Sequence, residues 1–202
     1  MKKKLLSLVC ALALTISLLP AAQALEGEGT RAAEALASLG LVTGIGAGYA
    51  AEKPATQEQA AALLVRLLGA EKAAKADRRS CGWVGIPSWA RSAVNYCAFH
   101  DLIDWSEYHA GGALDAELWC AMLLRMLGYK DEDVGGVWPD SYMAEAALIG
   151  LTDGVSGTGN EGLTRGQAAK LFLNLLRADQ KEGGSYLATL GETRTGQMLA
   201  SS

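Results

Sequence analysis

The sequence lacks a basic excess, a recognisable metal-ligand motif and any long apolar run beyond its first residues. It holds 18 Lys and Arg against 22 Asp and Glu, a net charge of −4. This balance argues against a nucleic-acid partner, which would require a basic face. Cys97 and His100 have a spacing that could share a metal, but no close Cys-x-x-Cys pair is present and the gaps match no zinc pattern. We therefore expect no metal site and no cofactor.

Catalytic motifs are also missing. There is no Gly-x-Ser-x-Gly, no P-loop and no Ser/His/Asp set in a credible frame. Hydrolysis of a glycan would need two carboxylates at a fixed separation. The acids of the middle segment cluster instead at predicted helix ends, where capping and solvation account for them: Asp101, Asp104, Asp115 and Glu117. The sequence predicts a protein that is not an enzyme.

The one long apolar run lies at the N-terminus. "MKKK" is a basic n-region, "LLSLVCALALTISLLP" is an apolar h-region, and "AQA" offers small residues where a signal peptidase reads them. We expect residues 1–24 to be a cleaved signal peptide, and no membrane span after cleavage. The alternative is a retained anchor, but the run is short of the roughly 20 residues that a spanning helix needs. Losing the three lysines of the signal would change the net charge from −4 to −7.

Three stretches share one pattern, which is the main signal in the sequence. When Thr56, Asp115 and Thr164 are aligned, the next twelve positions agree without gaps. Each of these three residues is a good N-cap, and Gln59 and Gln167 complete capping boxes. The apolar positions that follow have the spacing of one buried helix stripe: Leu63, Met122 and Leu171; Leu64, Leu123 and Phe172; Leu67, Met126 and Leu175; Leu68, Leu127 and Leu176.

A first helix precedes each of these second helices. The first helices end in "GLVTG", "DLIDW" and "GLTDG", and Leu36, Cys97 and Ala146 share one position on them. A two-helix unit cannot bury its apolar stripe alone, so the three units must pack on one another. We expect an all-α fold of three helix–loop–helix repeats that pack on one another. Very short extended segments are expected at "GWVGIP" and "GGVWPD".

The chain divides accordingly. Residues 1–24 are the signal peptide, and the repeats span 26–75, 82–131 and 134–180, with "EKAAKADRR" linking the first two. Residues 181–202 show no period and are expected to form a flexible C-terminal tail.

Three cysteines follow the signal, and an odd count does not make a disulfide framework. They are Cys81, Cys97 and Cys120. Cys97 and Cys120 stand at positions that hold Leu or Ala in the other repeats, as buried small thiols do. A Cys97–Cys120 bridge with one free thiol, and three buried thiols, are both compatible with this pattern.

At these residues the sequence resembles the S-layer homology (SLH) family, whose regions carry three tandem modules. "SWA" matches the Trp-Ala element of the family's first helix, and "GLVTG" and "GLTDG" match its turn. "ATQEQAAALLVRLLG" and "LTRGQAAKLFLNLLR" match its last helix, which begins with a Thr-Arg-Ala-Glu element. The resemblance covers nearly all of residues 28–180.

The resemblance implies that the three repeats pack as a pseudo-three-fold spindle. It also implies non-covalent anchoring to secondary cell-wall polysaccharide, often pyruvylated, in grooves between the modules. The family arginine suits anionic groups, the aromatic offers a flat face to a sugar ring, and the turn and helix start add backbone donors. In repeat three, Tyr142 and Met143 stand at the Trp-Ala position, with Trp138 nearby. The implied location is the cell wall or cell surface of a Gram-positive-type envelope, for a secreted protein. The candidate glycan-binding residues are Arg165, Thr164, Trp89, Trp138, Gly154 and Gly44.

The chain departs from the family pattern at the arginine. Only the third repeat keeps it, as Arg165, whereas Gln57 and Ala116 stand there in the other two. We therefore expect at most one full-strength glycan site. Arg66 and Arg125 match a late-helix arginine and are expected to make structural salt bridges or to face solvent. The competing interpretation is a structural or protein-interaction module of the same fold that has lost glycan binding.

Overall fold

A computed structural model describes residues 27–42, 50–104, 106–156 and 162–191. Within these ranges the regular structure is helical, which confirms the all-α prediction for them, and the extended pairings there are isolated bridges at Pro54–Thr164, Thr56–Ala113 and Asp179–Ser185. The segments "GWVGIP" and "GGVWPD" form loops and turns, apart from Asp140, which begins α7, so the extended segments expected there are absent. The helices are residues 27–38, α2 (Gln57–Leu67), α3 (Glu71–Ala76), α4 (Arg91–Phe99), α5 (Ala116–Met126), α6 (Asp131–Val134), α7 (Asp140–Leu148), α8 (Arg165–Arg177) and residues 186–191.

The second helix of each repeat begins at its predicted cap. The Thr56 hydroxyl accepts a hydrogen bond from the backbone N–H of Gln59, whose side chain accepts one from the Thr56 N–H in return. Thr164 makes the same box at the start of α8, and Asp115 accepts from the N–H three residues on in α5. These bonds satisfy N–H groups that have no partner within the helix. Both α2 and α5 are followed by a glycine of positive φ, Gly69 and Gly128 respectively.

The residues just before those caps close a ring of backbone hydrogen bonds. The Ala55 N–H donates to the Leu163 carbonyl at 2.9 Å, the Leu163 N–H donates to the Leu114 carbonyl at 2.7 Å, and the Leu114 N–H donates to the Ala55 carbonyl at 2.9 Å. Each repeat therefore donates to one neighbour and accepts from the other. This cyclic pattern gives the packing its pseudo-three-fold character.

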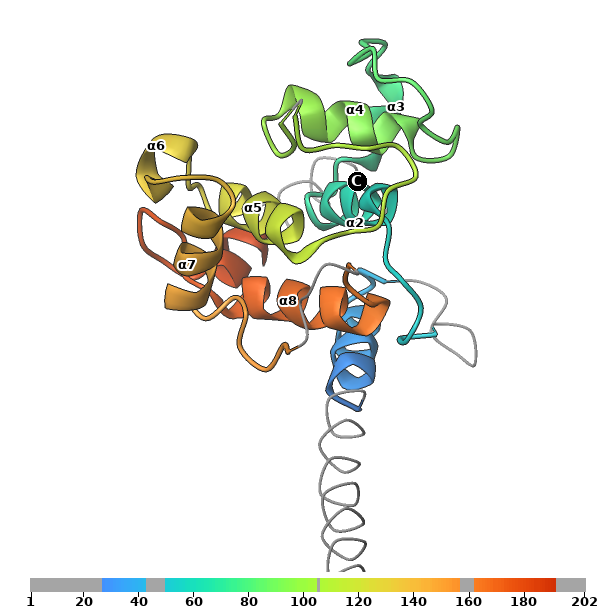
Figure 1. Ribbon diagram of the computed structural model, residues 1–202. Coiled ribbons are helices and arrows are strands. Elements are labelled where there is room, and N and C mark those ends of the chain that lie inside the picture. The colour runs from blue at the N-terminus through green and yellow to red at the C-terminus, as the bar shows by residue number, and fades with distance from the viewer. Residues whose placement is uncertain (1–26, 43–49, 105, 157–161, 192–202) are drawn as a thin grey trace, which may run out of the picture.

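Each first helix packs on the second helix of the preceding repeat. The helix α4 lies against α2, and α7 lies against α5 (Figure 1). Residues 27–38 close the set on α8, where a Cβ added at Gly29 would lie only 2.8 Å from the Gly166 Cα. The two backbones can touch there because neither residue has a side chain. The repeats are therefore interlocked into one unit, and each contact between them involves residues far apart in sequence.

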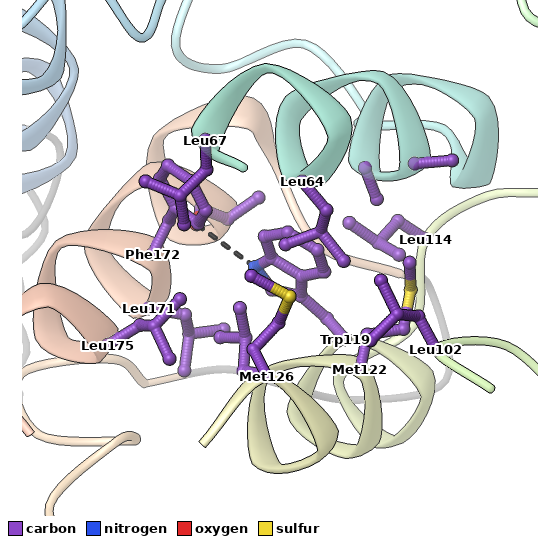
Figure 2. Packing of buried hydrophobic residues seen from close by; sticks show 14 of the residues in the cluster. Leu64, Leu67, Leu102, Leu114, Trp119, Met122, Met126, Leu171, Phe172 and Leu175 are labelled. Atoms are coloured by element: carbon purple, nitrogen blue, oxygen red, sulfur yellow. Dashed lines mark hydrogen bonds between the residues drawn. The ribbon is translucent and has the colours of Figure 1, made fainter. Parts of the chain in front are cut away.

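The helices α2, α5 and α8 enclose the core. Trp119 of α5 is fully buried, its ring stacks on Phe172 of α8 with centroids 5.9 Å apart, and its Nε1–H donates to the Ala168 carbonyl at 3.1 Å. Figure 2 shows this indole beside Leu64 of α2 and the apolar side chains of α8. One aromatic residue thus contacts the second helices of the other two repeats.

The cysteines after the signal are buried free thiols. Burial raises the pKa of the Cys97 thiol to about 12. Burial, with the nearby charge of Glu117, also raises the pKa of Cys120 to about 12. The alternative with three buried thiols is confirmed, and the Cys97–Cys120 bridge is not formed. Among the described residues no group of three or more His, Cys, Asp or Glu side chains is placed to hold a metal ion.

Two segments are more ordered than the sequence indicated. The linker "EKAAKADRR" contains α3, which packs on α4. In the expected tail, the Lys181 N–H donates to the Leu127 carbonyl at 3.0 Å, and the helix at 186–191 buries Tyr186 and Leu190. The prediction of a flexible tail is therefore wrong as far as residue 191, and its remainder lies outside the described residues. In the portion that is described, no helix has the length and apolarity to span a bilayer.

Asp101 occupies a left-handed position at which the other repeats use glycine. The φ angles are +55° at Asp101, +69° at Gly40 and +78° at Gly150. Replacing Asp101 with glycine is expected to raise the free energy of unfolding by about 0.5–1 kcal/mol, because glycine adopts this conformation without a Cβ clash. Urea denaturation measures the change. The reverse substitution Gly40→Asp, with open space around its Cβ position, should cost a similar amount, and equal midpoints for all three proteins would contradict the explanation.

Candidate functional site

Arg165 and Trp89 line one cavity of about 350 Å³, to which all three repeats contribute. Trp89, just before α4, is 61% exposed, and Arg165 is the first residue of α8. We call this cavity the Arg165 groove. Its other lining residues come from α2, α5, α8 and the adjoining loops: Val42, Ala55, Gln59, Ala60, Ala62, Leu63, Arg66, Leu114, Trp119, Ala168 and Ala169.

The first turn of α8 is held by the loop of repeat one. The Arg165 N–H donates to the Lys53 carbonyl and the Gly166 N–H donates to the Ala51 carbonyl, both at 2.8 Å. These bonds fix the backbone from which the Arg165 side chain extends. The arginine of repeat three thereby lines a groove that the second helix of repeat one also lines.

Arg66 is the second guanidinium that lines the groove. Its Nη1 donates to the Leu41 carbonyl at 3.1 Å, and its Nε lies 3.9 Å from Glu71 Oε1. The side chain remains 34% exposed. The expectation that Arg66 makes a structural salt bridge or faces solvent is confirmed, and the same side chain also lines the cavity. Two guanidiniums, an exposed indole and an apolar wall form a surface that suits an anionic sugar.

Thr164 and Gly154 line a different cavity, of about 560 Å³, together with Lys170. We call it the Lys170 groove. Lys170 Nζ lies 3.9 Å from Glu28 Oε2, and Gly154, with φ +71°, leaves the space that both side chains use: a Cβ there would lie 2.8 Å from Glu28 Oε2. The Thr164 hydroxyl is engaged in its cap. Four of the sequence-predicted residues are thus divided between two cavities, Arg165 and Trp89 in one and Thr164 and Gly154 in the other. The remaining lining residues are Gly29, Thr30, Ala51, Glu52, Val155, Ser156, Gly166 and Gln167.

Trp138 occupies the position equivalent to Trp89. Each tryptophan directly precedes the N-cap of a first helix, Ala90 for α4 and Pro139 for α7. The alignment of Tyr142 with the family tryptophan is therefore wrong. Trp138 is 43% exposed and lines neither groove, and its ring meets that of Tyr142 edge-on at 5.2 Å. The predicted glycine at position 44 lies outside the described residues.

Repeat one uses the arginine position for packing. Gln57 is 3% exposed, its Oε1 accepts from the His109 N–H at 2.8 Å, and its Nε2 donates to the Ala113 carbonyl at 3.2 Å. The neighbouring Glu58 accepts from the Gly111 N–H and from a tyrosine hydroxyl. Burial would raise the pKa of Glu58, but these hydrogen bonds outweigh it and hold the pKa below its usual value. In repeat two the same position is a buried alanine.

Two curated proteins are similar to the chain. The middle cell wall protein of Brevibacillus brevis is 32% identical over 198 residues, which cover 89% of this chain and 18% of that protein. The surface layer protein of Brevibacillus choshinensis is 30% identical over 170 residues, which cover 76% and 15%. No protein-family model matches the chain. The chain is thus related to cell-wall and surface-layer proteins, neither of which is named as an enzyme, and it spans less than a fifth of their length.

Proposed function

We propose that this chain attaches non-covalently to an anionic secondary polysaccharide of the bacterial cell wall through the Arg165 groove. The observation that carries the proposal is the convergence of Arg165 and the exposed Trp89, from different repeats, on one cavity. The names of the two relatives support a secreted protein at the surface of a Gram-positive-type envelope. The resemblance to SLH modules supports a saccharide ligand, with a pyruvyl group as one source of its charge.

In the proposed binding mode, one residue recognises the charge of the saccharide and another packs against its ring. A guanidinium presents parallel N–H donors that match a carboxylate, so Arg165 would bind the anionic group. The indole of Trp89 offers an apolar face against which one side of a sugar ring can pack. Because the groove is open to solvent, salt should weaken the attraction between the charges.

The test is co-sedimentation with purified Brevibacillus brevis sacculi that retain their polysaccharide. We expect the exported chain to bind, and Arg165→Ala to weaken binding by about 10- to 100-fold, since a charged hydrogen bond contributes about 1.5–3 kcal/mol. Lys170→Ala is the matched control, because it removes a positive charge from the Lys170 groove and should leave binding unchanged.

Two results would count against the proposal in different ways. If the wild-type chain does not bind intact sacculi, glycan anchoring is excluded and a protein-interaction module of the same fold is favoured. Equal binding by Arg165→Ala and the wild type would exclude the Arg165 groove as the site. Sacculi stripped of polysaccharide should bind neither protein.

A further inference from the structure

One position of the three second helices has a common structural task. Arg66, Arg125 and Asn174 each lie ten residues after the N-cap of their helix. Each donates a side-chain hydrogen bond to the carbonyl of the turn that ends the first helix of its own repeat. The acceptors and distances are Leu41 at 3.1 Å, Leu102 at 3.4 Å and Leu151 at 2.9 Å.

The amide of Asn174 performs this task without a charge, so the two arginines carry a charge that the turn does not require. The charge of Arg125 is compensated by acids of the protein. Glu107 binds its two terminal nitrogens at 2.7 and 2.8 Å, and Asp131 lies 3.5 Å from it. The Arg125 and Glu107 side chains are only 9% and 6% exposed.

The surroundings of Arg66 are open by comparison. Its one ion pair among the described residues is with Glu71, at 3.9 Å, and the Glu71 side chain is 48% exposed. In repeat three, the Tyr142 ring lies 5.5 Å from the Arg125 guanidinium. The equivalent residue of repeat two, four positions before Cys97, is Ala93. Repeat two thus has a methyl group where repeat three has a phenol, and Arg66 itself lines the Arg165 groove.

We propose that Arg66 is a second anion-binding residue of the Arg165 groove, and that it holds a carboxylate of the bound saccharide as Arg125 holds Glu107. The inference rests on the proposed function and specifies the anionic group that the site binds, a carboxylate. Glu107 is the internal template, because it shows a carboxylate bound by a guanidinium that also donates to its turn carbonyl. Two guanidiniums on one small cavity favour a saccharide with a carboxylate over a neutral one.

The test uses the residue that repeat three has at this helix position, Asn174, as the substitution for Arg66. In Arg66→Asn the amide can keep the bond to the Leu41 carbonyl, as Asn174 does for Leu151, while the charge is removed. We expect a urea midpoint close to that of the wild type. Affinity for immobilised polysaccharide, released from Brevibacillus brevis sacculi by muramidase, should fall about tenfold or more, and its dependence on salt should become shallower. Arg66→Gln, with a longer amide, is measured in parallel in case the asparagine is too short.

The outcomes separate the two proposals. A folded Arg66→Asn or Arg66→Gln variant that binds like the wild type overturns the role of Arg66 and leaves the proposed function intact. A wild-type chain that does not bind the polysaccharide overturns both. Amidation of the polysaccharide carboxylates with carbodiimide and ethanolamine should abolish the difference between wild type and variant. A difference that survives amidation would point to phosphate and overturn the carboxylate assignment.

Discussion

Replacement of Trp119 with alanine is expected to lower the free energy of unfolding by about 3–5 kcal/mol. The indole is fully buried, stacks on Phe172 and donates its N–H to the Ala168 carbonyl. Its removal would leave a cavity where α2, α5 and α8 meet (Figure 2), and the remaining side chains cannot collapse into it fully. Guanidinium chloride denaturation at neutral pH, monitored by circular dichroism, measures the loss.

Two further tryptophan variants make this prediction specific. Trp119→Phe keeps an aromatic ring but loses the N–H donor, so its loss of stability should be intermediate. Trp138→Ala removes an indole that is 43% exposed, and its effect should be much smaller. If Trp119→Ala and Trp138→Ala had equal stability, the central packing role of Trp119 would be wrong.

Replacement of Glu107 with alanine is expected to lower the free energy of unfolding by about 3–5 kcal/mol. The change would leave the Arg125 guanidinium, 9% exposed, without the carboxylate that binds two of its nitrogens. A buried charge without its partner costs far more than the pair contributes. Asp131 lies 3.5 Å from Arg125, but its side chain is 76% exposed. It is therefore too solvated to replace the lost carboxylate fully. Chemical denaturation measures this effect as well.

A double variant distinguishes an unpaired charge from a general packing defect. Arg125→Asn removes the guanidinium and copies the residue that repeat three uses at this position, so it should recover much of the stability lost in Glu107→Ala. Glu132→Ala removes an exposed acid from the same region and should unfold like the wild type. No recovery in the double variant would show that the ion pair is not the cause.

Much of the local structure follows from short-range sequence. The caps at Thr56, Asp115 and Thr164 were predictable because a side-chain oxygen reaches only the N–H groups of the next turn. The apolar stripe was predictable because its period equals that of a helix. The all-α fold follows from the same patterns, which left open whether Cys97 and Cys120 form a bridge. These properties depend on neighbours within a few residues, and the sequence shows those directly.

The make-up of the candidate site depends on contacts that the sequence does not display. Each first helix packs on the second helix of the preceding repeat, and Trp89 of repeat two and Arg165 of repeat three line one cavity together with α2 of repeat one. Aligning the repeats with one another could not reveal this arrangement. That alignment predicted Thr164 and Gly154 in the same site as Arg165. The ordered helix at 186–191 was missed for the same reason, since its burial comes from tertiary contacts of Tyr186 and Leu190.

Arg66 and Arg125 show most clearly which properties follow from the sequence and which follow from the tertiary structure. The sequence by itself determined that two equivalent helices each carry an arginine at the same register, ten residues after the cap. Only the tertiary structure decided that one is enclosed by Glu107 and Tyr142 while the other faces an open groove. The physical reason is that the environment of a charge is set by side chains distant in sequence. Glu107 comes from the loop of the same repeat and Tyr142 from the next repeat, and helix periodicity specifies neither.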